Sequence, residues 1–355
     1  MPDPLYNLVA FLVSLLVVLL ATPIVKKIGL KSGHFDKPGD RKIHKRPMVR
    51  LGGVSIFLGT LAGLLIVWWT GGFGVLPPEK EYEVWGVTIG GLAFFLIGLA
   101  DDLFNLSPVT RLILQAIVAG LAWNVGVQID FLTIPTIGLV SLPDVVSLPI
   151  TIIWLVGMAN AINWIDGLDG LAAGVSGIAA VVMFIVCLFM RQPAAALIAA
   201  ALAGGALGFL RYNFNPAQIF MGDGGAYFMG FSLAGIGIIG LVKGVTTVAL
   251  TVAVVLPYLI LAVPILDMSA VILDRLRRGK SPFVADKRHL HHRLLQAGLS
   301  QRLTVLFIYS LTLWAGTLAL AVSGMPSGLG YAIGATILLS FTGWQVWKTA
   351  RQSQA

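Results

Sequence analysis

Two adjacent carboxylates, Asp101 and Asp102, end a long apolar run of the sequence. If this run spans a membrane, ionised side chains at its end are costly, and such residues are usually kept for function. A carboxylate pair can bind a divalent cation or act as a base. Ser107 and Pro108 are the expected N-cap and first residue of the following helix. Because Arg111 lies in its first turn, the segment predicts an anion site beside the carboxylates.

Amides and carboxylates recur every three residues from Asn160 through Asn163 and Asp166 to Asp169. On a regular helix each step of three residues rotates the side chain back by about 60°, so the last would lie opposite the first. Two glycines in the segment are expected to end the helix and let the chain fold back toward one pocket. These oxygens suit Mg²⁺, base edges or ribose hydroxyls, and polar packing between helices is the alternative.

Asp223 lies among glycines at a predicted helix start, where the backbone could approach a bound anion closely. A Gly-Asp-Gly run is also a common turn, so this motif is weak on its own. The motif becomes significant because the other carboxylate segments are predicted to lie on the same side of the membrane.

Three histidines, His289, His291 and His292, gather in a basic segment. If the segment is helical, the first and last of them are neighbours on one face. Binding of a diphosphate is the favoured interpretation. Zinc is the alternative, although no cysteine or nearby glutamate completes a ligand set. A second basic segment, residues 26–50, holds nine Lys and Arg residues and favours a lipid phosphate, although topology alone also explains it.

A helical membrane bundle must position these residues. Hydrophobic residues make up 57% of the 355 and charged residues 11%, whereas a soluble domain carries about 25% charged residues. The 41 glycines suit helices that approach closely. We expect a single all-α domain over residues 1–355 with about eleven spans. The apolar runs lie near residues 5–25, 51–70, 84–100, 109–128, 147–163, 171–190, 194–210, 224–241, 245–266, 303–323 and 328–347.

The basic residues divide unevenly between alternate loops. If the N-terminus is outside and the C-terminus is cytoplasmic, 21 Lys and Arg residues are inside and three are outside. This split obeys the positive-inside rule and explains the pI of 9.7 without a nucleic-acid partner. All five histidines then lie inside, and the outer segment 130–148 is expected to hold a small hairpin. The predicted cytoplasmic loops are 26–50, 101–111, 160–170, 211–223 and 267–302.

At these motifs the chain resembles the polyprenyl-phosphate N-acetylhexosamine-1-phosphate transferase family. The resemblance covers residues 36–302 and rests on five ordered segments. They read DKPGDRKIHKRPMVRLGG, DDLFNLSP, NAINWIDGLDGL, FMGDGG and SPFVADKRHLHHRL. The sequence His-Leu-His-His from residue 289 is similar to the branch that uses UDP-GlcNAc and undecaprenyl phosphate, not to the muramyl-pentapeptide branch.

The resemblance implies a role for each matching residue. The aspartate pair would activate or orient the lipid phosphate, Asn163 and Asp223 would bind Mg²⁺ or Mn²⁺, and Asp169 would contact uracil. Arg111 stands where relatives often have lysine, which differs in geometry. Catalytic roles fall to Asp101, Asp102, Asp166 and His289, and substrate-binding roles to Lys45, Asn105, Arg111, Asn160, Asp169, Arg288, His291 and His292.

The expected reaction is transfer of GlcNAc-1-phosphate from UDP-GlcNAc to undecaprenyl phosphate at the cytoplasmic face of a bacterial plasma membrane. It would begin the synthesis of a cell-envelope polysaccharide or a teichoic-acid-type polymer. Another UDP-N-acetylhexosamine or UDP-MurNAc-pentapeptide is the alternative donor. The downstream polymer, the choice between direct and double displacement, and a homodimeric state stay open. A transporter and a hydrolase are the rival classes of function. A transporter would place its ionisable residues near the midplane of the membrane, whereas here they are predicted at one face. A hydrolase would need a nucleophile–base set or a zinc motif, and the sequence has neither.

Overall fold

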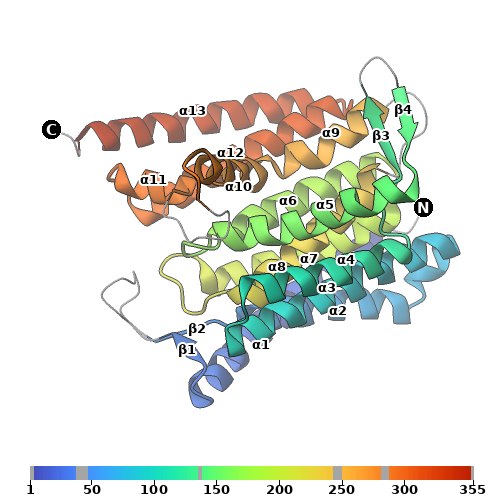
Figure 1. Cartoon of the computed structure of the whole chain (residues 1–355), viewed down its shortest axis with the longest axis horizontal. Helices are drawn as coiled ribbons and strands as arrows, with labels where there is room; N and C mark the ends of the chain where they lie inside the picture. The colour runs from blue at the N-terminus through green and yellow to red at the C-terminus, as the bar shows by residue number, and fades with distance from the viewer. Residues whose placement is uncertain (1–3, 37–46, 135–137, 243–249, 281–287, 353–355) are drawn as a thin grey trace.

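Helices dominate the structure, a computed structural model that describes residues 4–36, 47–134, 138–242, 250–280 and 288–352 (Figure 1). Two short stretches depart from α geometry: the 3₁₀ helix η1 (Gly72–Val75) and the π-helical η2 (Gly237–Val242). The α-helices are α1 (Pro4–Lys31), α2 (Gly52–Trp69), α3 (Pro78–Phe104), α4 (Pro108–Asn124), α5 (Asp144–Ile165), α6 (Leu171–Phe189), α7 (Pro193–Asn213), α8 (Gly222–Ile236), α9 (Leu250–Ile260), α10 (Ala262–Arg277), α11 (Leu290–Gln296), α12 (Gln301–Val322) and α13 (Gly328–Gln352).

Nine helices of the described residues are long and apolar enough to cross a membrane, namely α1, α2, α3, α5, α6, α7, α8 with η2, α12 and α13. The chain is therefore an all-α, multi-pass membrane protein. The predicted span at 109–128 corresponds to α4, which has 17 residues. The predicted span at 245–266 is not one helix: it begins outside the described residues, and α9 ends before a break at Leu261. The count of eleven stays a prediction.

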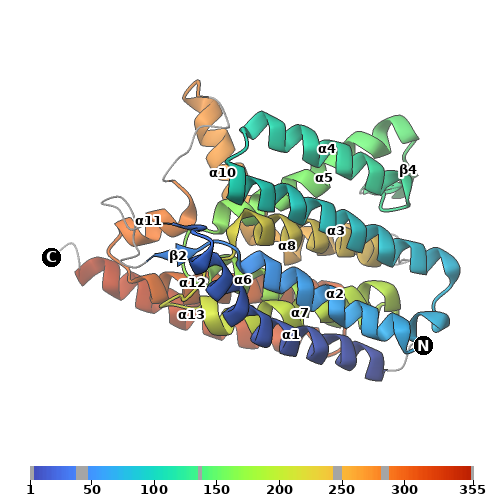
Figure 2. The same ribbon diagram turned by 90° about the horizontal axis from the view of Figure 1, so that it is seen from below.

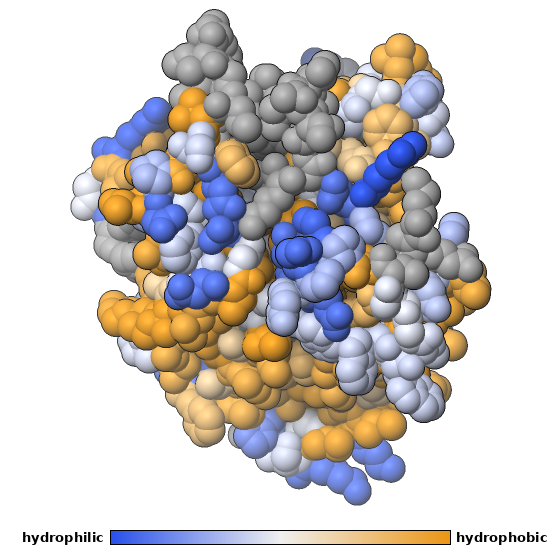
Figure 3. Space-filling model, turned by 90° about the vertical axis from the view of Figure 1, so that its right-hand side faces the viewer, coloured by the Kyte–Doolittle hydropathy of each residue, from blue (hydrophilic) through white to orange (hydrophobic). Residues whose placement is uncertain are grey.

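The helices lie side by side, and the chain termini lie at opposite ends of the bundle (Figures 1 and 2). Strands β1 (Phe35–Asp36) and β2 (Met48–Val49) lie with α11 at the end that carries the C-terminus. Figure 3 views the bundle from the end that carries β3 and β4 and shows hydrophilic and hydrophobic residues side by side on that end. An odd number of spans requires termini on opposite sides, as the charge pattern predicts.

The predicted hairpin in segment 130–148 is confirmed. Strands β3 (Phe131–Ile134) and β4 (Gly138–Ser141) pair antiparallel, with Phe131 opposite Ser141. The hairpin lies at the end of the bundle away from β1 and β2 (Figure 1). Its position agrees with the expectation that it and the basic loops occupy opposite sides of the membrane.

Glycines bring the central helices α2, α3, α5 and α8 into close contact. A Cβ added at Gly98 of α3 would lie 2.4 Å from the carbonyl oxygen of Asp223, and one at Gly230 of α8 would lie 2.6 Å from the Cα of Ala159. Residues 224–241 of the α8 span are all buried within the bundle. Small residues allow this packing where no larger side chain would fit. The start of α8 is therefore held at the centre of the molecule.

Backbone hydrogen bonds join the segment before α2 to the segment before α8. The amides of Gly52 and Gly53 donate to the carbonyl oxygens of Phe220 and Met221, at 2.9 and 2.7 Å. The amide of Phe220 donates in turn to the carbonyl oxygen of Val49 at 2.9 Å. These three bonds join parts of the chain that are far apart in sequence. They fix the position of residue 50 over the N-terminus of α8.

Candidate active site

The turn between α3 and α4 carries the aspartate pair. Asp101 and Asp102 lie in the last turn of α3, which ends at Phe104 and not before the pair. Asn105 follows as the C-cap with φ of 52°, and it is exposed. The hydroxyl of Ser107 accepts the Thr110 amide hydrogen at 3.1 Å, so the predicted N-cap is confirmed. The loop between the helices is only three residues long and holds the pair against the start of α4.

Arg111 returns from the first turn of α4 to the aspartate pair, as predicted. Its Nη1 forms a short ion pair with Asp101 and lies 3.8 Å from Oδ2 of Asp223. The side chain of Asp101 is buried, and that of Arg111 is about a quarter exposed, at 26%. A buried carboxylate needs a partner of this kind, because its desolvation would otherwise be costly.

Asp102 faces a different neighbour. Its side chain is 2% exposed, and its Oδ2 accepts the amide hydrogen of Gly224 at 3.0 Å. It thereby satisfies a free amide in the first turn of α8 and places negative charge at that helix N-terminus, which is favourable. Its Oδ1 lies 3.9 Å from Nη2 of Arg50 and accepts no hydrogen bond from the described residues. This oxygen is a buried acceptor that is available to a further ligand.

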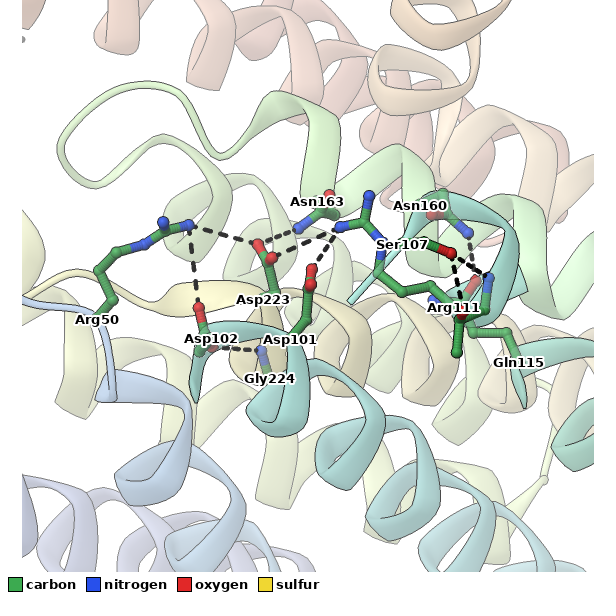
Figure 4. Close-up of polar contacts among 11 residues, drawn as sticks. Arg50, Asp101, Asp102, Ser107, Arg111, Gln115, Asn160, Asn163, Asp223 and Gly224 are labelled. Carbon is green, nitrogen blue, oxygen red and sulfur yellow. Dashed lines mark hydrogen bonds and ion pairs between the residues drawn. The ribbon is translucent and has the colours of Figure 1, made fainter. Parts of the chain in front are cut away.

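Asp223 lies at the centre of the site, where side chains from several segments approach it (Figure 4). Its Oδ1 accepts from Nδ2 of Asn163 at 2.7 Å and lies 3.7 Å from Nη2 of Arg50, while Arg111 approaches its Oδ2. The carboxylate is 19% exposed and Arg50 49% exposed, so the open side of the cluster faces solvent. Burial alone would lower the pKa of Arg50, but the charges of Asp223 and Asp102 outweigh it and raise that pKa.

The turn between α5 and α6 provides two more carboxylates. Helix α5 ends at Ile165, and Gly170 has φ of 79° at the start of α6, so the predicted break is confirmed. Oδ2 of Asp169 accepts from Nδ2 of Asn215 at 2.9 Å and from the Ala217 amide at 3.0 Å. Enclosure by the protein raises the pKa of Asp166 to about 7, and the nearby charge of Asp223 acts in the same direction.

Asn160 lies apart from this cluster. Its Nδ2 donates to Oε1 of Gln115 at 2.7 Å and to the carbonyl oxygen of Val156 at 2.8 Å. Gln115 is fully buried on α4. The pair links α4 to α5, one turn of helix from Asn163. A substrate-binding role for Asn160 stays a prediction, and the contacts found for it are those of helix packing.

The histidines form a second cluster at the start of α11, in contact with α10 and the end of α5. His289 is the N-cap of α11 and so precedes the helix, and its ring lies 5.8 Å from the parallel ring of His291. The rings of His291 and His292 are 4.2 Å apart. Within the described residues, no three His, Cys, Asp or Glu side chains form a group that could hold a metal ion. Arg288 forms an ion pair with Asp274, outside the cluster.

His291 is 2% exposed and packs against the turn that follows α5. A Cβ added at Gly167 would lie 2.4 Å from its Nε2, so only glycine leaves room for the ring. Burial, together with the neighbouring His292 and His289, lowers the pKa of His291 to about 3. This ring is therefore neutral at physiological pH, and it offers a diphosphate no positive charge.

The structure gathers five of the predicted residues in one cluster. Arg111 and Asn163 contact Asp223, Asp101 is linked to it through Arg111, and Asp102 through Arg50. Arg50 was not among the predicted site residues, although it lies in the basic segment 26–50. Its charge was one of nine in that segment, and nothing in their spacing distinguishes it. Lys45 lies outside the described residues.

The donor set around Asp223 fits a magnesium ion. Mg²⁺ takes oxygen ligands and is commonly held by one or two carboxylates together with substrate phosphates. Asp223 and the unpartnered Oδ1 of Asp102 are carboxylate oxygens, and Asn163 can offer its amide oxygen after a flip of the side chain. Arg50 and Arg111 flank the same place, so the cluster can receive phosphate groups as well.

Comparison with known proteins agrees with the family resemblance of the sequence motifs. Residues 84–241 match the family described as glycosyl transferase family 4. A Bacillus subtilis protein named probable undecaprenyl-phosphate N-acetylglucosaminyl 1-phosphate transferase is 37% identical over 95% of this chain and 86% of its own length. A Mycobacterium tuberculosis protein named decaprenyl-phosphate N-acetylglucosaminephosphotransferase is 34% identical over 87% of this chain and 80% of its own length.

A Pasteurella multocida protein named undecaprenyl-phosphate alpha-N-acetylglucosaminyl 1-phosphate transferase is 33% identical over 85% of this chain and 81% of its own length. The family match spans the aspartate pair, the α5–α6 turn and the start of α8. The family and the relatives indicate an enzyme that transfers a phospho-sugar. The chain therefore belongs to glycosyl transferase family 4.

Proposed function

We propose that this enzyme transfers GlcNAc-1-phosphate from UDP-GlcNAc to undecaprenyl phosphate and releases UMP. The observation that carries the proposal is the cluster in which three carboxylates and two arginines surround the N-terminus of α8. Both substrates are anionic, so a site that joins them must offset their repulsion. The relatives' names supply the sugar and the carrier lipid.

The proposed reaction is a direct, in-line displacement. An oxygen of the lipid phosphate attacks the sugar-proximal phosphorus of UDP-GlcNAc, and a new P–O bond forms. The bond from that phosphorus to the bridging oxygen breaks, and UMP leaves with the electron pair. Arg50 and Arg111 would bind phosphate oxygens, and Asp101 or Asp102 would accept any remaining proton of the lipid phosphate. Such transfers depend on positioning and charge neutralisation more than on covalent help.

Asp223 and Asn163 are the proposed Mg²⁺ ligands, and Oδ1 of Asp102 would join them where Asp101 is the group that accepts the proton. When bound, the ion would neutralise charge on the donor diphosphate. Asp169 is the proposed contact to uracil, and its second oxygen stays available because only Oδ2 is used by Asn215 and Ala217. His289 is proposed to meet the sugar end of the donor.

The proposed setting is a bacterial plasma membrane. The 21-to-3 division of basic residues supports a single eleven-span domain with the N-terminus outside and the active site cytoplasmic. The product would enter the synthesis of an envelope polysaccharide or a teichoic-acid-type polymer. A homodimer is compatible with the largely exposed helix α13, in which only Gly328, Ala332 and Ala335 are buried.

The test is transfer by the purified enzyme in detergent with Mg²⁺ and undecaprenyl phosphate. Radiolabelled UDP-GlcNAc, UDP-GalNAc and UDP-MurNAc-pentapeptide are compared as donors, and labelled lipid is measured. We expect UDP-GlcNAc to be used and the muramyl donor to be rejected. Preference for the muramyl donor would overturn the branch assignment. Absence of labelled lipid with all three donors, from enzyme that is folded and monodisperse, would overturn the proposed reaction.

A further inference from the structure

A buried aspartate on α10, Asp267, holds His289 in place. Its Oδ2 lies 2.8 Å from Nδ1 of the histidine ring, and its Oδ1 accepts the backbone amide hydrogen of Leu290 at 2.7 Å. The two side chains are 6% and 8% exposed. Both carboxylate oxygens are thus engaged at the start of α11, so His289 is fixed in position and in ring orientation together.

The same histidine contacts the end of α5, where the site residue Asn163 lies. The ring of Trp164 meets that of His289 edge to face, with centroids 5.8 Å apart, and the guanidinium of Arg275 lies 5.1 Å from the Trp164 centroid. Trp164 directly follows Asn163, whose amide binds Asp223. His289 therefore contacts the residue that follows Asn163 of the central cluster, and Asp267 of α10 holds it there.

We infer that Asp267 is a positioning residue, which keeps the ring proton of His289 on Nδ1 and presents Nε2 to the nucleotide sugar. The inference rests on the proposed function, in which His289 meets the donor. The Leu290 amide can only donate, so it requires Oδ1 as an acceptor. The remaining oxygen, Oδ2, accepts only from an Nδ1 that carries hydrogen. The neutral ring therefore has its lone pair on Nε2, and the protonated ring has a charged N–H there.

The substitution Asp267→Asn keeps the shape of the side chain but changes its hydrogen bonding. It therefore tests whether Asp267 positions His289 or only fills space. The amide oxygen of the asparagine would take the Leu290 hydrogen bond, so its NH₂ group would face Nδ1. Nδ1 must then accept, and the only ring proton moves to Nε2. A neutral Nε2–H can neither accept a hydrogen bond from the sugar nor carry positive charge to the diphosphate. Inversion of a histidine tautomer by an Asp→Asn change severely impairs the Ser-His-Asp proteases.

The tautomer is measured first, with the full-length enzyme in detergent and ¹⁵N-labelled histidine. Only five histidines are present, and the loss of one set of signals in His289→Asn assigns the ring. We expect the proton on Nδ1 in the wild type and on Nε2 in Asp267→Asn. Retention of the Nδ1 proton in the variant would overturn the inference, whatever the donor specificity of the enzyme proves to be.

Kinetics then test whether Asp267 acts through His289. We expect Asp267→Asn to lower kcat/KM for UDP-GlcNAc by about 10- to 100-fold, the range found when the supporting partner of a metal-binding histidine is lost. In the double variant Asp267→Asn/His289→Ala, kcat/KM should equal that of His289→Ala within about twofold. Losses that multiply would show that Asp267 acts independently of the histidine, and would overturn the inference.

Two further variants keep the test decisive if Asp267→Asn folds poorly. His289→Asn retains an N–H near the position of Nδ1 but lacks Nε2, whereas His289→Gln places an amide near Nε2. We expect the first to keep the wild-type melting temperature and to lose activity, and the second to recover part of it. Equal activity of the two would contradict the inference. The control is Asp144→Asn, an exposed carboxylate in the first turn of α5 at the other end of that helix, which should leave kcat/KM unchanged.

Discussion

The carboxylates of Asp101 and Asp102 serve different partners, although the two residues are neighbours in the sequence. Asp101 forms an ion pair with Arg111 of α4, whereas Asp102 accepts the Gly224 amide hydrogen at the start of α8. Successive side chains of a helix point about 100° apart, so one turn of α3 reaches both neighbouring helices. The pair therefore consists of two separate groups with distinct surroundings, and each can be tested alone.

The choice between direct and double displacement can be tested on this pair. In a direct displacement no phosphorylated enzyme forms, so labelled UMP should not exchange into UDP-GlcNAc without carrier lipid. We expect no such exchange in the wild type, Asp101→Asn or Asp102→Asn. Lipid-independent exchange that disappears in one of the two variants would establish an aspartyl-phosphate route through that residue.

Substitution of Arg50 should weaken phosphate binding. Hydrogen bonds to charged groups contribute about 1.5–3 kcal/mol, so we expect Arg50→Gln to lower kcat/KM by about 10- to 100-fold. Arg278→Gln is the matched control, because Arg278 has the same exposed fraction of 49% and also pairs with an aspartate. Separate KM values for UDP-GlcNAc and undecaprenyl phosphate identify the phosphate concerned. Equal activity of the two variants would remove Arg50 from the site.

Asp223 should be the carboxylate whose loss most changes the metal requirement. We expect Asp223→Ala to reduce kcat by about 10²–10³-fold, the usual effect of removing one group that stabilises charge in a transition state. The Mg²⁺ concentration for half-maximal activity should rise, and Mn²⁺ binding measured by electron paramagnetic resonance should weaken. Asp144→Ala is the control. Full turnover with unchanged Mg²⁺ dependence would exclude Asp223 as a ligand.

Acid should destabilise the protein through His291. Its pKa falls from the ordinary 6.5 to about 3 on folding, so the unfolded chain binds more protons between these values. Stability therefore rises with pH through this window and is lost as pH falls. The neutral ring lies among His289, His292 and the carboxylate of Asp267. We expect His291→Gln to lose less melting temperature than the wild type between pH about 7.5 and about 5. An equal loss in both would contradict the assignment.

The orientation of the chain can be measured by cysteine labelling after replacement of Cys187 by alanine. Glu79 and Lys280 are exposed residues at opposite ends of the predicted topology. Lys280 is preferable to the adjacent Gly279, whose φ of 67° disfavours any side chain. We expect Glu79→Cys to react with a membrane-impermeant reagent from outside whole cells and Lys280→Cys only after lysis. Labelling of both from outside would reject the proposed topology.

Local signals predicted much of this structure. The Ser107 cap, the glycine-broken turn after α5 and the return of Arg111 toward the aspartates each depend on residues within about three helical turns of one another. Hydropathy also located the apolar runs. It did not detect the break at Leu261, because the run through 245–266 stays apolar on both sides of it. Apolar character records where a chain can be buried and not where its helix ends.

Arg50 and Asp267 could not be predicted as site residues, because their partners are distant in sequence. Arg50 reaches Asp223 because segments 49–53 and 220–221 are paired through their backbones. His289 depends on Asp267 of another helix, and that aspartate lies in an otherwise apolar part of α10. Neither residue carries a local motif that separates it from its charged neighbours. Such contacts are a property of the packed bundle.

Main-chain groups make the bonds between segments 49–53 and 220–221, so these bonds do not depend on the side chain at position 50. The tight space is at the glycines: a Cβ at Gly53 would lie 2.2 Å from the Gly225 amide, and one at Gly222 would lie 2.0 Å from the Arg50 carbonyl oxygen. Evolution can therefore exchange the residue above Asp223 while the frame beneath it is kept. A change in the charge or length of the side chain at position 50 would therefore alter which anionic substrate the enzyme binds, without rearranging the helices.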